Sequence, residues 1–152
     1  MEEKRKQQYR VQLTSHTPDG ECVETVAIGV GRVNEKGGIL TYREPEETGL
    51  GKTETKLTFR DGRLAMERSG ETNASFVFLP SVWTDVKMTS GGLGLCARAY
   101  TKTAAFLLEE KRATIGFSYV LQYSEEYETE LKMEIRIAEV KTAVEFDCEG
   151  VE

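Results

Sequence analysis

Apolar and polar side chains alternate along most of this chain with a period of two residues. The alternation is clearest over residues 113–123, where one face is apolar and the other polar. The next segment, 127–137, places Leu131, Met133 and Ile135 between charged residues. This period is typical of β-strands that have one face on a core and the other in water. The short polar stretch between the two segments predicts a hairpin connection.

The same alternation recurs upstream, and turn sequences separate the apolar segments. Asp61–Gly62 is the strongest hairpin signal, because Asp-Gly suits a two-residue turn in which both residues have positive φ. The other predicted strands cover residues 9–14, 22–30, 39–44, 52–60, 64–68, 75–79, 83–88 and 93–103. Residues 104–112 fit either a short helix or an extended strand end, and the pattern does not decide between them.

About ten short strands with frequent turns predict an all-β fold. Successive hairpins favour up-and-down order, and closure of the sheet removes the unpaired edges at which strands aggregate. We therefore expect a closed or nearly closed antiparallel up-and-down barrel of about 8–10 strands over residues 9–137. Residues 1–8 are expected to form a frayed N-terminus, and residues 138–152 an acidic C-terminal extension.

Size and charge narrow the class of protein further. The chain has 152 residues and a net charge of −6, which fits one domain and argues against a nucleic-acid partner. No apolar run reaches the ~18 residues of a membrane span, and no secretory signal is visible. Three cysteines without Cys-x-x-Cys spacing indicate neither a disulfide framework nor a metal site. These features predict a cytoplasmic protein without a metal or other cofactor.

Catalytic chemistry has little support in the sequence. His16 is the only histidine and lies on the polar face of the first predicted strand, so no catalytic triad or Cys/His pair is indicated. Glu44 is a candidate general base if burial raises its pKa. The sequence therefore favours a non-enzymatic binding protein over an enzyme, and leaves the question open.

An ordered set of short motifs resembles a known family. The motifs are Tyr42-Arg43-Glu44, Gly51-Lys52-Thr53-Glu54-Thr55-Lys56, Met66-Glu67-Arg68-Ser69-Gly70, Phe76-Val77-Phe78 and Met88-Thr89-Ser90-Gly91-Gly92-Leu93. Together they resemble the YwiB-like bacterial proteins, a calycin-like (lipocalin-like) β-barrel family of unknown function. The resemblance covers roughly residues 11–137 and excludes the acidic tail and the 104–112 segment. It implies a barrel, a bacterial source and a cytoplasmic location, but no activity, since a barrel fold alone never fixes function.

Two charged residues share a strand face with apolar residues and are the strongest candidates for a site. Alternation from Leu64 through Met66 gives Arg68 the parity of the inward side chains. Alternation through Tyr42 likewise gives Glu44 the parity of the inward side chains. A buried, unpaired charge costs several kcal/mol, so Arg68 and Glu44 are expected to pair or to contact a ligand. Arg68 then suits an anionic head group, and a purely structural ion pair near the barrel mouth is the other interpretation.

Aromatic residues are abundant enough to line or to fill the barrel. They are Tyr42, Phe59, Phe76, Phe78, Trp83, Phe117, Tyr119 and Tyr127. A barrel of about eight strands is just wide enough for packed side chains or one small ligand. The first hypothesis is that the barrel binds a small apolar or acyl-type anion. The residues expected to contact this ligand are Tyr42, Glu44, Arg68 and Trp83.

The alternative hypothesis is a packed barrel that works through its outer surface. In that case an external patch around Phe76, Phe78 and Trp83 contacts a protein partner or forms a homodimer, because both faces of these strands contain apolar residues. The two hypotheses differ in whether the interior holds a cavity.

Overall fold

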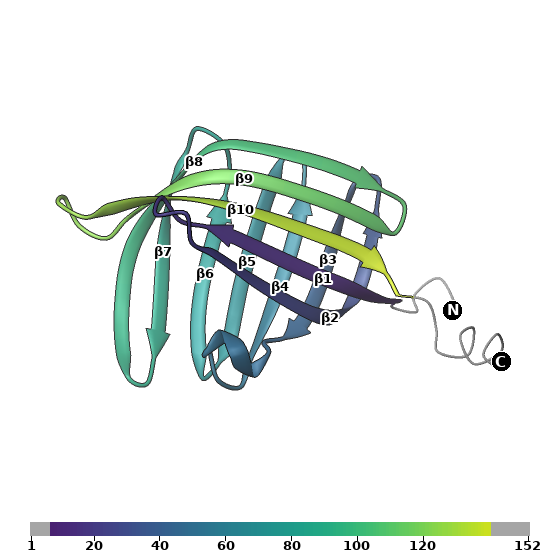
Figure 1. Cartoon of the computed structure of the whole chain (residues 1–152), viewed down its shortest axis with the longest axis horizontal. Helices are drawn as coiled ribbons and strands as arrows, with labels where there is room; N and C mark the ends of the chain where they lie inside the picture. The colour runs from purple at the N-terminus through teal and green to yellow at the C-terminus, as the bar shows by residue number, and fades with distance from the viewer. Residues whose placement is uncertain (1–6, 141–152) are drawn as a thin grey trace.

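The computed structural model describes residues 7–140, and these form ten antiparallel strands closed into a barrel (Figure 1). The strands are β1 (Gln7–His16), β2 (Cys22–Asn34), β3 (Gly37–Arg43), β4 (Thr53–Arg60), β5 (Arg63–Gly70), β6 (Thr72–Phe78), β7 (Trp83–Ser90), β8 (Leu93–Glu109), β9 (Arg112–Gln122) and β10 (Glu128–Glu139). A turn of 3₁₀ helix, η2 (Glu46–Thr48), connects β3 to β4. The predicted closed antiparallel barrel is confirmed.

The strand order is the predicted up-and-down order. Each strand pairs with the next along the chain, and β1 pairs with β10 to close the sheet. The β4–β5 hairpin turns at Asp61 and Gly62, whose φ angles of 55° and 75° give the turn the twist that antiparallel strands require. Local hairpins therefore make nine of the ten strand pairs, and the tenth pair, β1–β10, closes the barrel.

The segment that the pattern left open, 104–112, is strand. β8 continues to Glu109, and a short turn leads into β9 at Arg112. A β-bulge between Thr101 and Thr103 shifts the register of β8 against β9. Because a bulge inserts one extra residue, the more buried positions change from odd to even numbers there, which obscures the simple alternation.

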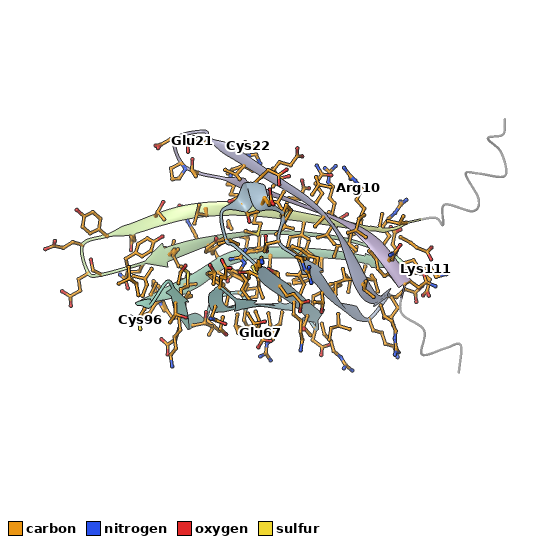
Figure 2. The ribbon with its side chains drawn as sticks, turned by 90° about the horizontal axis from the view of Figure 1, so that it is seen from below. Arg10, Glu21, Cys22, Glu67, Cys96 and Lys111 are labelled. Atoms are coloured by element: carbon orange, nitrogen blue, oxygen red, sulfur yellow. The ribbon has the colours of Figure 1, made fainter. Side chains whose placement is uncertain are left out.

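The barrel has two distinct ends. We call the end that carries η2 and the β1–β2 turn the mouth, and the other the far end. Figure 2 shows Lys111 at the far end, near the points where the described chain begins and ends, and Arg10 and Glu67 projecting outward from the barrel wall. β1 begins at Gln7 and β10 ends at Glu139. The rest of the two predicted terminal segments, residues 1–6 and 141–152, lies outside the described residues.

Apolar side chains fill most of the interior. Phe76, Phe78, Phe117 and Tyr119 form an aromatic cluster in which Phe78 lies 4.5 Å from Phe117 and 4.9 Å from Tyr119 between ring centroids. Aromatic rings at such distances contribute favourable packing beyond the area they bury. The aromatic residues therefore fill this part of the barrel rather than line an open lumen.

The aromatic cluster corrects the expected external patch. Phe76 and Phe78 are only 8% and 2% exposed, so they point into the core. Of the three expected members, Trp83 alone lies outside, at 41% exposed. The prediction failed because the short β6 strand places both phenylalanines on the inward parity shared with Ala74. A homodimer remains a prediction.

Candidate functional site

A pocket of about 580 Å³ opens at the mouth of the barrel. Strand residues form its wall, and the loop around η2 adds Pro45, Thr48 and Leu50. The apolar wall residues are Leu13, Val23, Val26 and Met133. Ligand sites are commonly concave and apolar with a few polar groups, and this pocket has that character.

Three of the four predicted site residues come together in this pocket: Tyr42, Glu44 and Arg68. Tyr42 lies opposite Thr55 in the β3–β4 pairing, and Thr55 lies opposite Arg68 in the β4–β5 pairing. Directly opposed residues on one face of a sheet have Cβ atoms about 5 Å apart. Two successive hairpins thus bring residues distant in sequence into one row across the inner surface.

Glu44 and Arg68 form a largely buried ion pair. The side chain of Glu44 is 2% exposed and that of Arg68 is 19% exposed, with 3.5 Å between Oε2 of Glu44 and Nε of Arg68. The hydroxyl of Thr55 donates a hydrogen bond to the same carboxylate oxygen. Burial of a carboxylate is tolerated when a cation and a hydrogen-bond donor offset its lost hydration. The ion pair therefore stabilises the inward orientation of both charged side chains.

Arg68 keeps hydrogen-bonding capacity beyond this pair. Within the described residues its Nε is buried without a hydrogen-bond partner. Its side chain also borders the mouth pocket. A guanidinium has five N–H donors in a planar fork, so one ion pair does not exhaust it. An oxyanion in the pocket is the group best suited to accept the remaining hydrogen bonds.

Two buried tyrosines near the pair stay protonated at neutral pH. Burial raises the pKa of Tyr42 far above its ordinary value, and the negative charge of Glu44 raises it further, while Arg68 opposes both. Burial also raises the pKa of Tyr119 to about 12, with Arg68 again acting in the lowering direction. A protonated phenol is a hydrogen-bond donor, so Tyr42 offers the pocket a neutral polar group.

Buried threonines hold the loop at the mouth. The hydroxyls of Thr53 and Thr72 both donate to the carbonyl of Leu50, at 2.7 and 2.9 Å. The sequence interpretation missed these residues and Thr55, although Thr53 and Thr55 share the inward parity of Leu57 in β4. Alternation therefore predicted that these side chains point inward. A threonine on an apolar face is a weaker indication of a site than a charged residue, so they were not singled out.

Trp83, the fourth predicted site residue, does not join the others. It begins β7 at the far end of the barrel, where its ring lies 5.2 Å from that of Tyr100 between centroids. The guanidinium of Arg98 lies 4.4 Å from the ring centroid of Trp83. The ring of Trp83 therefore makes a cation–π contact with Arg98 on the outer surface. Trp83 is not part of the mouth site.

The charges that line the pocket are mostly negative. Glu24 and Glu47 line its rim, and Glu44 lies deeper beside Arg68. Glu24 is exposed and accepts a hydrogen bond from the side chain of Gln12. Water and salt screen such rim charges, whereas the buried pair is screened much less. The site therefore combines a neutral ion pair inside with a negative rim.

Residues 7–140 contain neither a cluster of potential metal ligands nor a membrane-spanning helix. No group of three or more potential metal ligands from His, Cys, Asp and Glu occurs among these described residues. In the same part of the chain no helix is both long and apolar enough to cross a bilayer. The mouth pocket is thus the candidate that the described residues support best.

The fold and the pocket define a ten-stranded antiparallel barrel domain with a buried ion pair at its mouth. The chain belongs to the family described as "Domain of unknown function (DUF1934)", which matches residues 10–135. The structure is similar to the crystal structure of the ywiB protein from Bacillus subtilis, with a TM-score of 0.78 and 21% identity over 91% of this chain and 95% of that one. The predicted resemblance to the YwiB-like family is confirmed, and at this identity the similarity shows the fold alone. No curated protein matches the sequence.

Proposed function

We propose that the barrel binds a small, partly apolar ligand with a single negative charge in the mouth pocket. The observation that carries this proposal is Arg68, whose guanidinium borders an apolar pocket with a buried N–H group unpartnered in the described structure. A carboxylate accepts paired hydrogen bonds from a guanidinium. Binding of this kind requires no covalent step.

The charges support a monoanion over a more highly charged ligand. Glu44 already offsets the charge of Arg68, so the interior offers donors more than net positive charge. Glu24 and Glu47 at the rim repel a phosphate ester or a dicarboxylate more strongly than a single carboxylate. Leu13 and Met133 provide apolar wall for an alkyl chain. The class that fits is a short or medium-chain carboxylic acid.

The first test is native mass spectrometry of the full chain, purified without detergent, beside a denatured sample. A mass excess that disappears on denaturation identifies a bound ligand and its mass. Calorimetric titration with octanoate, octanol and octylamine then measures the head-group preference. We expect octanoate to bind most tightly, since only it offers a charged acceptor to Arg68. Preference for octylamine, or equal binding of octanol, contradicts the proposal.

Variants of the ion pair test whether Arg68 causes the head-group preference. Arg68→Met combined with Glu44→Gln removes both charges and avoids leaving an unpaired carboxylate in the barrel. We expect this double variant to bind octanoate about tenfold or more weakly, since a charge-assisted hydrogen bond contributes about 1.5–3 kcal/mol. Arg98→Met, the same substitution on the outer surface beside Trp83, is the matched control and should bind like the parent. Unchanged affinity in the double variant would remove Arg68 from the site.

Other sequence-based expectations also remain predictions. They are the cytoplasmic location, the bacterial source, the calycin relationship and the division into a barrel with two terminal extensions. Each is compatible with the fold and follows from composition or from the family resemblance.

A further inference from the structure

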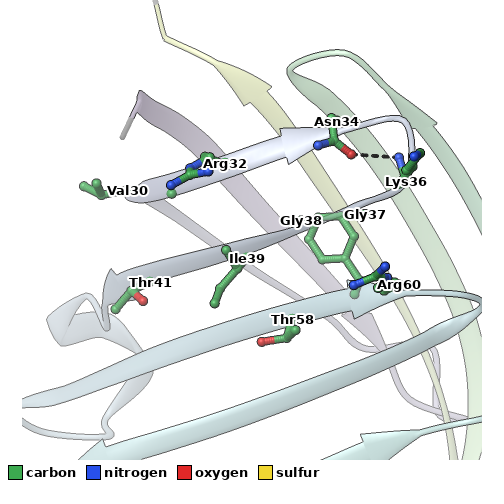
Figure 3. Close-up of a pocket in the computed structure, with 12 residues that line it drawn as sticks. Val30, Arg32, Asn34, Lys36, Gly37, Gly38, Ile39, Thr41, Thr58 and Arg60 are labelled. Carbon is green, nitrogen blue, oxygen red and sulfur yellow. Dashed lines mark hydrogen bonds between the residues drawn. The ribbon is translucent and has the colours of Figure 1, made fainter. Parts of the chain in front are cut away.

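The outer face of β2 and β3 exposes an apolar strip. Its residues are Ile28, Val30 and Ile39, each between 42% and 51% exposed. A second pocket, of about 570 Å³, lies over the strip and is lined by Val30, Ile39 and residues of β4 such as Thr58 (Figure 3). Contiguous apolar side chains on an outer sheet face usually mark a contact surface. This strip is separate from the mouth site, because its side chains point outward.

Basic residues surround the apolar strip. Figure 3 shows Arg32 beside Val30, and Lys36 and Arg60 at the other side of the pocket. The exposed cations of β1–β5 are Arg10, Arg32, Arg43, Lys56, Arg60 and Arg63, against the carboxylates Glu24, Glu54 and Glu67. The turns beside the pocket add Lys36, Glu35 and Asp61, and Asp61 pairs with Arg60 at 3.7 Å between Oδ2 and Nε. This part of the wall thus carries a formal charge of +2 in a chain whose net charge is −6. Its best complement is a segment that is both apolar and acidic.

The chain contains such a segment beyond the last described residue. Residues 141–152 read KTAVEFDCEGVE, with Lys141 as the only cation. Val144, Phe146 and Cys148 alternate with the acidic positions. An extended segment with this pattern presents apolar side chains on one side and carboxylates on the other. The apolar strip can contact the apolar side chains, and its basic border can contact the carboxylates.

The last described residue, Val140, lies within reach of the strip. The backbone N–H of Val140 donates to the carbonyl of Gln8 at 2.9 Å. Gln8 lies opposite Val30 in the β1–β2 pairing. Adjacent strands lie about 4.8 Å apart, so the chain leaves the barrel about 10 Å from Val30. Four extended residues span up to about 13 Å, which brings Val144 and Phe146 within reach of the pocket.

We propose that residues 142–149 bind the apolar strip of their own chain. Phe146 occupies the pocket between Val30 and Ile39, and the neighbouring carboxylates contact Arg32 and Arg60. A tethered segment has an effective concentration in the millimolar range, so even weak contacts keep it bound. A second copy is a less suitable occupant, because it presents the same basic surface and the whole protein carries the same net charge.

Paramagnetic relaxation on the full chain tests this proposal. Cys22 and Cys96 are exposed free thiols, and their replacement by serine leaves Cys148 as the single labelling site. With a nitroxide on Cys148, we expect the amide signals of Val30, Ile39 and their neighbours to lose most of their intensity. Signals of β7, on another part of the wall, should keep theirs. Uniform weak broadening around the barrel overturns the proposal.

Charge and aromatic variants supply the controls. Arg32→Glu with Arg60→Glu should restore the lost signals, as should Phe146→Ser. Lys87→Glu with Arg98→Glu makes the same charge change on β7 and β8 and should leave the broadening intact. Raised salt should weaken it, since exposed charges are screened. A mixture of isotope-labelled and spin-labelled molecules separates the sources: broadening that persists there shows a second copy as the occupant and overturns binding within one chain.

Discussion

At the scale of single residues, the ion pair at the mouth links stability to ligand binding. Arg68 and Glu44 have inward parity, and the sequence alone predicted that they would pair or contact a ligand. The structure shows the pair, at 3.5 Å between Nε and Oε2. Arg68 also lines the mouth pocket, and its buried Nε has no hydrogen-bond partner among the described residues. A structural role and a binding role are therefore compatible in the same two side chains.

A double-mutant cycle separates the structural part. Arg68→Met should destabilise the protein by about 3 kcal/mol, because the nearly buried Glu44 carboxylate then lacks its cation. Glu44→Gln should cost less, since Arg68 is partly exposed and retains contact with water. The combined variant should recover most of the loss from Arg68→Met. Urea unfolding followed by the fluorescence of Trp83 measures all four proteins, and a combined loss equal to the sum of the single losses would contradict the pairing.

At the scale of strands, alternation located the elements well and failed where the period of two is broken. The β8 bulge left residues 104–112 undecided, because an inserted residue changes the inward parity. Trp83 was misplaced for another reason: a residue at the start of a strand can lie at either barrel end, and parity alone carries no such information. Thr55 shows a third cause, since only the cross-strand register reveals its contact with Glu44.

Close strand approach is a further property that alternation does not reveal. Gly31 in β2 lies where a Cβ atom would come within 1.9 Å of the backbone carbonyl oxygen of Ile39 in β3. Gly31→Ala must therefore displace backbone, and we expect a loss of about 2 kcal/mol or more in the free energy of unfolding. Gly116 in β9 has no atom within 4 Å of the same position. Gly116→Ala is the matched control.

The control should be neutral or slightly stabilising, by up to about 1 kcal/mol, because alanine reduces the freedom of the unfolded chain. Thermal unfolding of the two variants beside the parent measures the difference. Equal melting temperatures for Gly31→Ala and Gly116→Ala would show that β2 and β3 lie further apart than described.

At the scale of the whole molecule, closure depends on one long-range pairing. Nine strand pairs are local hairpins, whereas β1 and β10 join residues from opposite ends of the barrel sequence. Closing a long loop costs more conformational entropy than forming a short hairpin. The β4–β5 hairpin, with its Asp61–Gly62 turn, has the local geometry to form early. We infer that the transition state for folding contains such hairpins and that the β1–β10 pair forms after it.

Kinetics on two core variants test this order. Ile137 in β10 lies opposite Val11 in β1, and Leu64 in β5 lies opposite Phe59 in β4; Ile137 is 1% exposed and Leu64 0%. Truncating either to alanine should cost about 2–5 kcal/mol. For Ile137→Ala the loss should appear mainly as faster unfolding, because its contacts are absent from the transition state. For Leu64→Ala a larger share should appear as slower folding. Stopped-flow folding and unfolding rates in urea give both shares, and the reverse assignment would mean that the barrel closes before its hairpins are complete.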